Sequence, residues 1–150
     1  MLFAKAIMEG RPIDVFNEGK MKRDFTYIDD IVSGVVAASD RIATRDADFD
    51  AANPDSATSS APFRIYNIGN HEPVELLQYI ECLERAIGKK AKRNLLPMQP
   101  GDVPATYADV NDLRAAVGFV PATTLEKGMA RFVGWYLEYG KIRANNIAKQ

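Results

Sequence analysis

The sequence predicts an α/β fold, and three observations lead to this prediction. Helical patterns of apolar residues alternate along the chain with short runs of β-branched and aromatic residues. Residues 64–87 read as a strand, a turn and an amphipathic helix, the unit from which parallel sheets are built. The 150 residues, 47% of them hydrophobic, suffice for one buried core. A complete doubly wound sheet needs several such units, so this chain is expected to be the end of one.

Composition excludes several classes of protein. Nineteen basic and twenty acidic residues leave a net charge of −1, so no positive field favours nucleic acid or an anionic membrane surface. No apolar run is long enough to span a bilayer, and the N-terminus lacks the pattern of a signal peptide, which together predict a cytoplasmic protein. A single cysteine, Cys82, and a single histidine, His71, exclude a disulfide framework and a Cys/His zinc site.

The first elements are a helix and two strands. Residues 2–8 form a short apolar helix, which Gly10 ends. Residues 13–16 and 25–28 are short β-branched and aromatic runs that predict strands. The glycine within residues 17–20 favours a hairpin-like connection, so the two strands are expected to pair with each other.

A helix with an apolar face follows, capped by Asp29 or Asp30 and ending near Arg41. Residues 43–62 are rich in Ala, Asp and Ser and contain one large apolar side chain, Phe49. Such a composition cannot bury enough apolar area to offset the cost of ordering the chain. We therefore expect a mobile insertion loop rather than a domain boundary.

Regular structure is predicted again after the insertion. Residues 63–68 are a predicted strand, and Pro73 suits the first turn of a helix over residues 74–87. Residues 93–96 are a weaker strand candidate. Three prolines in residues 97–104 preclude regular structure, so a fixed loop is expected there.

Two further helices complete the chain. Asp109 can cap a short helix over residues 110–117, and Thr123 with Glu126 forms a capping box before the last helix. That helix is expected to give way to polar residues. The predicted parts of the chain are a domain of residues 1–140 and a polar tail of residues 141–150.

Two motifs of oxidoreductases are missing from the sequence. No Gly-x-Gly-x-x-Gly turn is present to bring a dinucleotide pyrophosphate to a helix N-terminus. None of the six tyrosines is followed four residues later by lysine. Asp29 and Asp30 could form half of a metal site, but helix capping explains the pair without an ion. We therefore predict neither catalytic residues nor a metal site in this chain.

Two polar positions are candidates for ligand binding. Arg23 lies in the densest polar cluster, and its planar guanidinium could bind a diphosphate. Spacing alone favours another interpretation, a solvated turn in which Arg23 pairs with Asp24 or Asp29. Asp102 follows a Pro-Gly turn and could accept hydrogen bonds from two ribose hydroxyls, or it could belong to an ordinary Asp-containing turn.

Five segments carry a more specific pattern, in a fixed order and spacing. They are IDVFN at 13–17, GKMKRDFTYIDDI at 19–31, YNIGN at 66–70, EPVELL at 72–77 and QPGDVPATYAD at 99–109. This pattern resembles the C-terminal part of NAD-dependent nucleotide-sugar epimerases, which are extended short-chain dehydrogenase/reductases. It is most similar to the UDP-glucuronate 4-epimerase type and covers nearly the whole chain, apart from the insertion and the tail.

The resemblance implies a substrate-binding part of an extended short-chain dehydrogenase/reductase, with residual Rossmann strand–helix elements and without the N-terminal Rossmann core. In the family, the glycine-rich turn, the catalytic Ser or Thr and the Tyr-x-x-x-Lys precede the position of Met1. Family members oxidise C4 of the sugar with NAD and reduce the 4-keto sugar from the opposite face. The resemblance therefore implies NAD in the parent enzyme, no cofactor bound by this chain alone, and no activity of the chain alone.

By position, the resemblance assigns five substrate-binding residues. Arg23 matches the arginine that contacts the diphosphate, and Asp102 matches the acidic residue that binds ribose hydroxyls. Asp14 and Phe16 fall in the extended segment that holds uracil, largely through backbone groups. Gln99 stands where UDP-galactose epimerases carry a second phosphate-binding arginine, which disfavours that type because glutamine gives only neutral hydrogen bonds.

The leading hypothesis is a fragment that binds a UDP-sugar of the UDP-glucuronate/UDP-galacturonate class. Two alternatives are a non-catalytic module that binds a nucleotide or a partner protein, and a structural remnant without ligand affinity. The fragment is also expected to expose apolar surface on Ile65, Ile68 and the helix over residues 74–87, where the absent sheet would pack. Large bare patches favour self-association.

Overall fold

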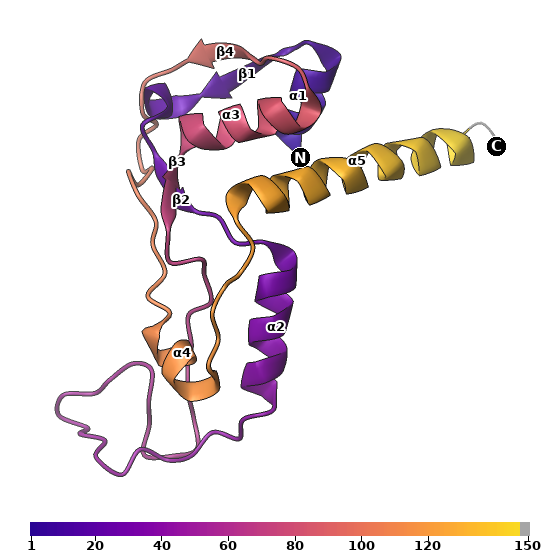
Figure 1. Ribbon diagram of the computed structural model, residues 1–150. Coiled ribbons are helices and arrows are strands. Elements are labelled where there is room, and N and C mark those ends of the chain that lie inside the picture. Colours follow the sequence, from indigo (N-terminus) through magenta and orange to yellow (C-terminus); the bar gives the residue numbers. More distant parts are fainter. Residues whose placement is uncertain (148–150) are drawn as a thin grey trace. The chain divides into compact units, whose positions relative to one another are not determined.

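The computed structural model describes residues 1–147, with side chains described through residue 140. The chain divides into two compact units, and each is assembled from segments that are distant in the sequence (Figure 1). The first unit contains Met1–Phe25, Pro73–Thr106 and the C-terminal segment from Thr123. The second contains Thr26–Glu72 and Tyr107–Ala122. No helix in the described part of the chain is long and apolar enough to cross a membrane.

Three helices form the core of the first unit: α1 (Leu2–Glu9), α3 (Leu76–Ile87) and α5 (Leu125–Ile147). The apolar face of α3 packs against both α1 and α5. Ile80 and Leu83 are only 0% and 1% exposed. The expectation of a bare apolar surface on this helix is therefore wrong, because the other two helices cover it.

Four short strands form two separate pairs in the first unit. Strand β1 (Pro12–Val15) pairs in parallel with β4 (Lys92–Leu95), and β2 (Lys22–Asp24) pairs antiparallel with β3 (Pro73–Glu75). The predicted hairpin is wrong, since β1 and β2 each hydrogen-bond to a strand far along the chain. Between them the chain turns through the short 3₁₀ segment η1 (Phe16–Gly19).

Several element boundaries differ from the prediction. The second strand is β2 rather than residues 25–28. Residues 63–68 form no strand, and β3 occupies the position where Pro73 was expected to begin a helix. Proline lacks an N–H and suits a short edge strand, so α3 begins only at Leu76. The parallel pair is consequently built from β1 and β4 rather than from the predicted unit at 64–87.

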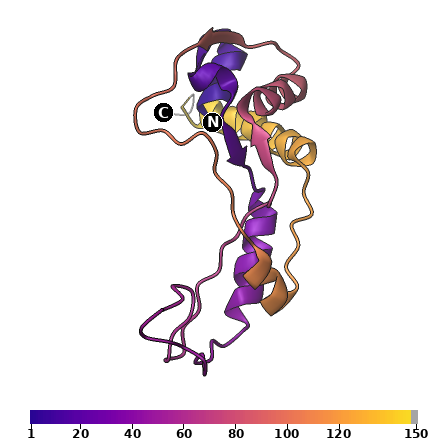
Figure 2. The ribbon, with the colours of Figure 1, turned by 90° about the vertical axis from the view of Figure 1, so that its left-hand side faces the viewer.

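Figure 2 shows the two helices of the second unit, α2 (Ile28–Ser39) and α4 (Asn111–Val117), in an orthogonal view. Gly34 of α2 lies against the ring of Phe119, where a Cβ would come within 3.1 Å. The guanidinium of Arg41 donates a hydrogen bond to the carbonyl of Ala116 at the end of α4.

The insertion at residues 43–62 contains no helix or strand. Its own backbone closes it, since the N–H of Asp46 donates to the carbonyl of Ser59 over 2.8 Å. The side chain of Thr58 is buried within this segment. The predicted mobility of the insertion stays a prediction.

Helix caps agree with the sequence in part. Asp109 lies just before α4 and accepts a hydrogen bond from the N–H of Asn111, but the N-cap residue of this helix is Val110. At the start of α5, the N–H of Lys127 donates a 3.3 Å hydrogen bond to the hydroxyl of Thr124, and the capping box of Thr123 with Glu126 stays a prediction. The predicted cap of α2 is wrong. Its N-cap residue is Tyr27, and the two aspartates at 29 and 30 lie in its first turn, where the helix dipole stabilises negative charge.

The last helix is longer than predicted. Helix α5 continues past Gly140 to Ile147, across part of the predicted polar tail. The rest of that tail, residues 148–150, lies outside the described residues.

Candidate functional site

A cavity of about 420 Å³ opens in the first unit. Four of the five predicted site residues line it: Asp14, Phe16, Arg23 and Asp102. The fifth, Gln99, is exposed and is not among the lining residues. The complete lining includes side chains from all three segments of the chain that form this unit.

The ends of the two parallel strands position the first part of the wall. Ile13 and Val15 of β1 are buried, so the alternation of the strand turns Asp14 the other way. The side-chain amide of Asn94 on β4 donates a 2.8 Å hydrogen bond to the carboxylate of Asp14. Phe16 follows directly at the carboxyl end of β1, where ligands of parallel sheets commonly bind.

Strand β2 supplies a second part of the wall. Met21, Arg23 and Phe25 alternate along extended backbone, and all three line the cavity. Successive side chains of a strand point to opposite faces, so Lys22 points away. Its ammonium group lies 3.9 Å from the carboxylate of Glu75 on the neighbouring strand.

Local contacts hold the guanidinium of Arg23. One terminal nitrogen, Nη1, donates a 2.8 Å hydrogen bond to the carbonyl of Lys22, and Nη2 lies 3.9 Å from the sulfur of Met21. Within the described part of the first unit, Arg23 forms no ion pair, and the predicted alternative of a pair with Asp24 is not realised. Arg23 therefore presents its positive charge to the cavity without a close ion pair to a carboxylate among the described residues of this unit.

A tight turn and a bridge to β2 place Asp102. The N–H of Asp102 donates to the carbonyl of Gln99 over 3.2 Å, and Gly101 between them has φ 87°. Positive φ at the third residue is typical of a type II turn with proline at the second. The following segment lies along β2, because the N–H of Lys22 donates to the carbonyl of Pro104 over 2.8 Å.

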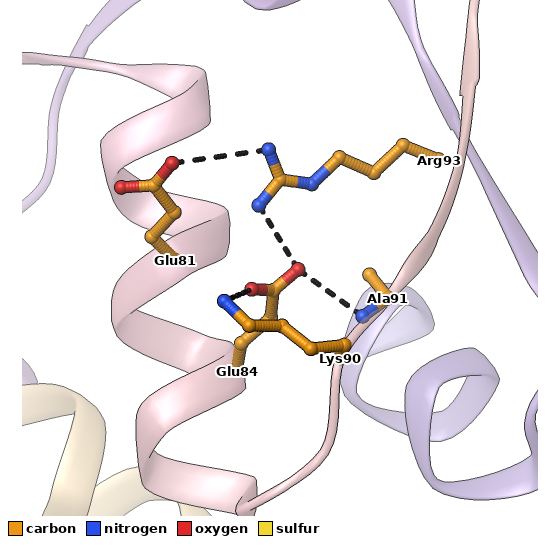
Figure 3. A network of polar contacts seen from close by, with 5 residues as sticks. All are labelled: Glu81, Glu84, Lys90, Ala91 and Arg93. Atoms are coloured by element: carbon orange, nitrogen blue, oxygen red, sulfur yellow. Dashed lines mark hydrogen bonds and ion pairs between the residues drawn. The ribbon is translucent and has the colours of Figure 1, made fainter.

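A buried carboxylate fixes the strand that leads into this loop (Figure 3). Glu84 of α3, 3% exposed, accepts hydrogen bonds from the side chains of Lys90 and Arg93 and from the N–H of Ala91. Arg93 also lies 3.9 Å from Glu81. Burial alone would raise the pKa of Glu84, but these hydrogen bonds and the charge of Arg93 lower it below its ordinary value. The network ties β4 to α3.

Aromatic and aliphatic side chains form the remaining wall. The rings of Phe25 and Tyr79 are stacked, with centroids 4.2 Å apart and an angle of 21° between their planes. Phe3 of α1 and Phe132 of α5 line the cavity from other sides. Sequence reasoning named neither Tyr79 nor Phe132 as a site residue. The alternation from Met21 to Phe25 was a usable signal for β2, but no sequence pattern pointed to Tyr79.

The cavity wall therefore combines charged and aromatic side chains. One cation and two carboxylates converge with five aromatic rings. No group of three or more metal-ligating side chains occurs among the residues that the structure describes. Such a site can bind an anion through Arg23, accept hydrogen bonds through its aspartates, and pack a flat apolar group against its rings.

Comparison with known proteins gives a family match and several relatives. Residues 1–69 match the model of the NAD dependent epimerase/dehydratase family. The chain is 47% identical over 139 residues to the protein CapI of Staphylococcus aureus, and 46% identical over 141 residues to a probable UDP-glucuronate 4-epimerase of Rhizobium meliloti. These matches cover 93% and 89% of this chain. The chain spans about two fifths of the length of these relatives, 42% and 40% respectively.

Solved structures agree with these relatives. A mutant UDP-glucuronic acid 4-epimerase from Bacillus cereus, in complex with a fluorinated UDP-glucuronic acid and NAD, matches 93% of this chain with a TM-score of 0.72 and 28% identity. This chain covers 40% of that protein. The UDP-glucose 4-epimerase of Thermotoga maritima matches 92% of this chain with a TM-score of 0.71; at 21% identity it shows the fold alone.

Fold and comparisons together define the class. The chain has an α/β fold like that of extended short-chain dehydrogenase/reductase epimerases and is a relative of the nucleotide-sugar epimerases, which confirms the predicted likeness to that group of enzymes. UDP-glucuronate 4-epimerases are among these relatives.

Proposed function

We propose that this chain binds the UDP part of a UDP-sugar and is the C-terminal substrate-binding part of an NAD-dependent UDP-glucuronate 4-epimerase. One observation carries the proposal. Arg23 and Asp102, assigned to the diphosphate and the ribose by resemblance, line a single cavity together with Asp14 and Phe16. Relatives of this type with 46% and 37% identity support the substrate class.

Each proposed contact has a physical basis. The guanidinium of Arg23 presents several N–H donors and a permanent positive charge, which suits a diphosphate. The carboxylate of Asp102 accepts hydrogen bonds from the ribose hydroxyls. The segment from Asp14 to Phe16 holds the uracil at the carboxyl end of β1. Gln99 is exposed and is not among the residues that line the cavity, so the proposal assigns it no contact in this structure.

The described residues do not fit NAD. Dinucleotide sites use a strand, a glycine-rich turn and a helix N-terminus to hold the pyrophosphate. In this chain β1 continues into η1, and β4 continues into the proline-containing segment after Leu95. The proposed role of this chain is therefore to bind and orient the UDP-sugar, and we expect no epimerase activity of the chain alone.

Titration calorimetry with UDP tests the proposal on the 150-residue chain. We expect saturable binding of UDP and UDP-glucuronate, with UDP-glucuronate and NAD giving no UDP-galacturonate. A folded chain that shows no saturable heat with millimolar UDP would overturn the binding role and leave a structural remnant. Turnover by the chain alone would overturn the assignment of the hydride chemistry to other residues.

A further inference from the structure

The cavity wall contains one aromatic side chain with a polar group. Five aromatic residues line the cavity, and four of them are phenylalanines. The fifth, Tyr79 of α3, carries the only aromatic hydroxyl among the described residues of the wall. The resemblance to nucleotide-sugar epimerases assigned no role to this position.

The ring of Tyr79 has a fixed place beside the proposed phosphate contact. It stacks on Phe25, with ring centroids 4.2 Å apart. Phe25 follows Arg23 by two residues on the same face of extended backbone. The stacked rings of Phe25 and Tyr79 thus line the cavity together with the guanidinium of Arg23.

The hydroxyl of Tyr79 is available to a ligand. It makes no hydrogen bond to any side chain or backbone group in the part of the chain that the structure describes, and its oxygen is not sealed from the surroundings. Burial raises the pKa of Tyr79, so the phenol keeps its proton at neutral pH and acts as a hydrogen-bond donor. A donor left without a partner in a partly apolar wall is costly unless a ligand or water satisfies it.

We propose that Tyr79 is a further ligand-binding residue, whose hydroxyl donates a hydrogen bond to a carbonyl oxygen of a pyrimidine base. Its ring, stacked on Phe25, forms the flat wall beside that base. The base is the part of a UDP-sugar that combines a flat apolar surface with carbonyl acceptors, whereas the phosphates and the ribose match Arg23 and Asp102. The inference rests on the proposed function, because it assumes a uridine nucleotide in the cavity.

Tyr79→Phe tests this contact, since it removes the hydroxyl and keeps the ring stack. We expect the Kd for UDP, measured by calorimetry on the full chain, to rise about three- to tenfold, the usual effect of losing one neutral hydrogen bond. The melting temperature and the salt dependence of binding should stay as in the wild type, because no charge is changed. Tyr136→Phe is the matched control: it removes the same atom from a tyrosine on α5 that does not line the cavity.

The outcomes separate this inference from the proposed function. Weaker UDP binding in Tyr79→Phe alone, at an unchanged melting temperature, supports the contact. A Kd within about twofold of the wild type overturns it. An equal loss of UDP affinity in Tyr136→Phe also overturns the contact. A loss of affinity in Tyr79→Phe that is accompanied by a lower melting temperature overturns it too, since either result indicates an indirect effect. Absence of UDP binding in the wild type overturns the proposed function, and the inference with it.

Discussion

Arg23 and Asp102 line one cavity, yet no ion pair joins them within the described residues. Backbone hydrogen bonds next to both residues set their positions, because the N–H and the carbonyl of Lys22 bond to the segment that follows Asp102. Because the two opposite charges do not pair with each other, each can bind a different group of one ligand. A nucleoside diphosphate has two such groups, an anionic diphosphate and a pair of ribose hydroxyls.

Loss of the positive charge should weaken UDP binding strongly. We expect Arg23→Ala to raise the Kd for UDP about 10- to 100-fold, because a charge-assisted hydrogen bond contributes about 1.5–3 kcal/mol. Arg23→Lys should restore the charge but not the paired donors, giving an intermediate affinity. Calorimetric titration at two salt concentrations measures both effects.

Lys22→Ala is the matched control for Arg23, since it removes the neighbouring cation of β2 on the opposite face. Its effect on UDP binding should stay within about twofold, as expected of an exposed charge outside the cavity. Equal losses in the Lys22 and Arg23 variants would show that general electrostatic attraction, rather than a specific contact, drives binding.

Asp102 should discriminate UDP from 2′-deoxy-UDP. If the carboxylate accepts a hydrogen bond from the ribose 2′-hydroxyl, the wild type should bind UDP about tenfold more tightly than the deoxy analogue. Asp102→Ala should reduce that ratio to near one while weakening UDP binding. A ratio that survives the substitution would assign the 2′-hydroxyl to another partner.

Much of the fold was predictable because helices leave local signals. The apolar spacing in α3 and the glycines that follow α1 and α3 gave the helices nearly at their observed bounds. Gly10 and Gly88 both adopt the left-handed backbone typical of a helix end, with φ of 71° and 76°. The hydrogen bond from the N–H of Asn111 to Asp109 at the start of α4 is equally local, although Val110 is the N-cap residue.

Strand pairing was not predictable, because it depends on partners that are distant in the sequence. The sequence of residues 13–16 and 25–28 is typical of a hairpin, but β1 pairs with β4, a strand far along the chain. Residues 63–68 have strand composition and still form no strand among the described residues. The composition of a segment indicates only its propensity for a sheet. Whether it forms a strand depends on a hydrogen-bonding partner strand, which the tertiary fold provides.

The candidate site, like the fold, was predictable only in part. Arg23, Asp102, Asp14 and Phe16 were named through an ordered family pattern, and from spacing alone Arg23 looked like a surface ion-pair residue. Tyr79 carries no such pattern. It reaches the cavity because α3 packs beside the extended segment that contains Phe25, a relationship between elements that no local pattern encodes.

Gly19 should tolerate no side chain. Its φ is +80°, and a Cβ at this position would lie 2.4 Å from Cγ and Cδ2 of Leu77. We expect Gly19→Ala to lower the free energy of unfolding by about 2–4 kcal/mol, combining backbone strain with overpacking. Gly88→Ala is the matched control, because its φ is +76° and nothing lies within 4 Å of the added Cβ. Urea denaturation showing equal losses in both variants would mean that Leu77 moves aside at no cost.

The carboxylate of Glu84 should contribute to stability through its charge. Glu84→Gln keeps the size of the side chain but removes the charge that Lys90 and Arg93 share. We expect a loss of about 2 kcal/mol in the free energy of unfolding, because the acceptor is buried while Lys90 is exposed. Glu81→Gln is the control: Glu81 is half exposed, lies 3.9 Å from Arg93, and should contribute no more than about 0.5 kcal/mol.

The same carboxylate makes a prediction about pH. In the folded chain its hydrogen-bond partners hold the pKa of Glu84 below the value it takes in the unfolded chain. Its contribution is therefore complete above the ordinary glutamate pKa and is lost as the pH falls through the lower, folded-state pKa. Denaturation measured from about pH 7 to about pH 3 should show the wild type losing its advantage over Glu84→Gln in the acidic part of this range. An advantage that stays constant down to the lowest pH would show that the charge of Glu84 is not what holds β4 against α3.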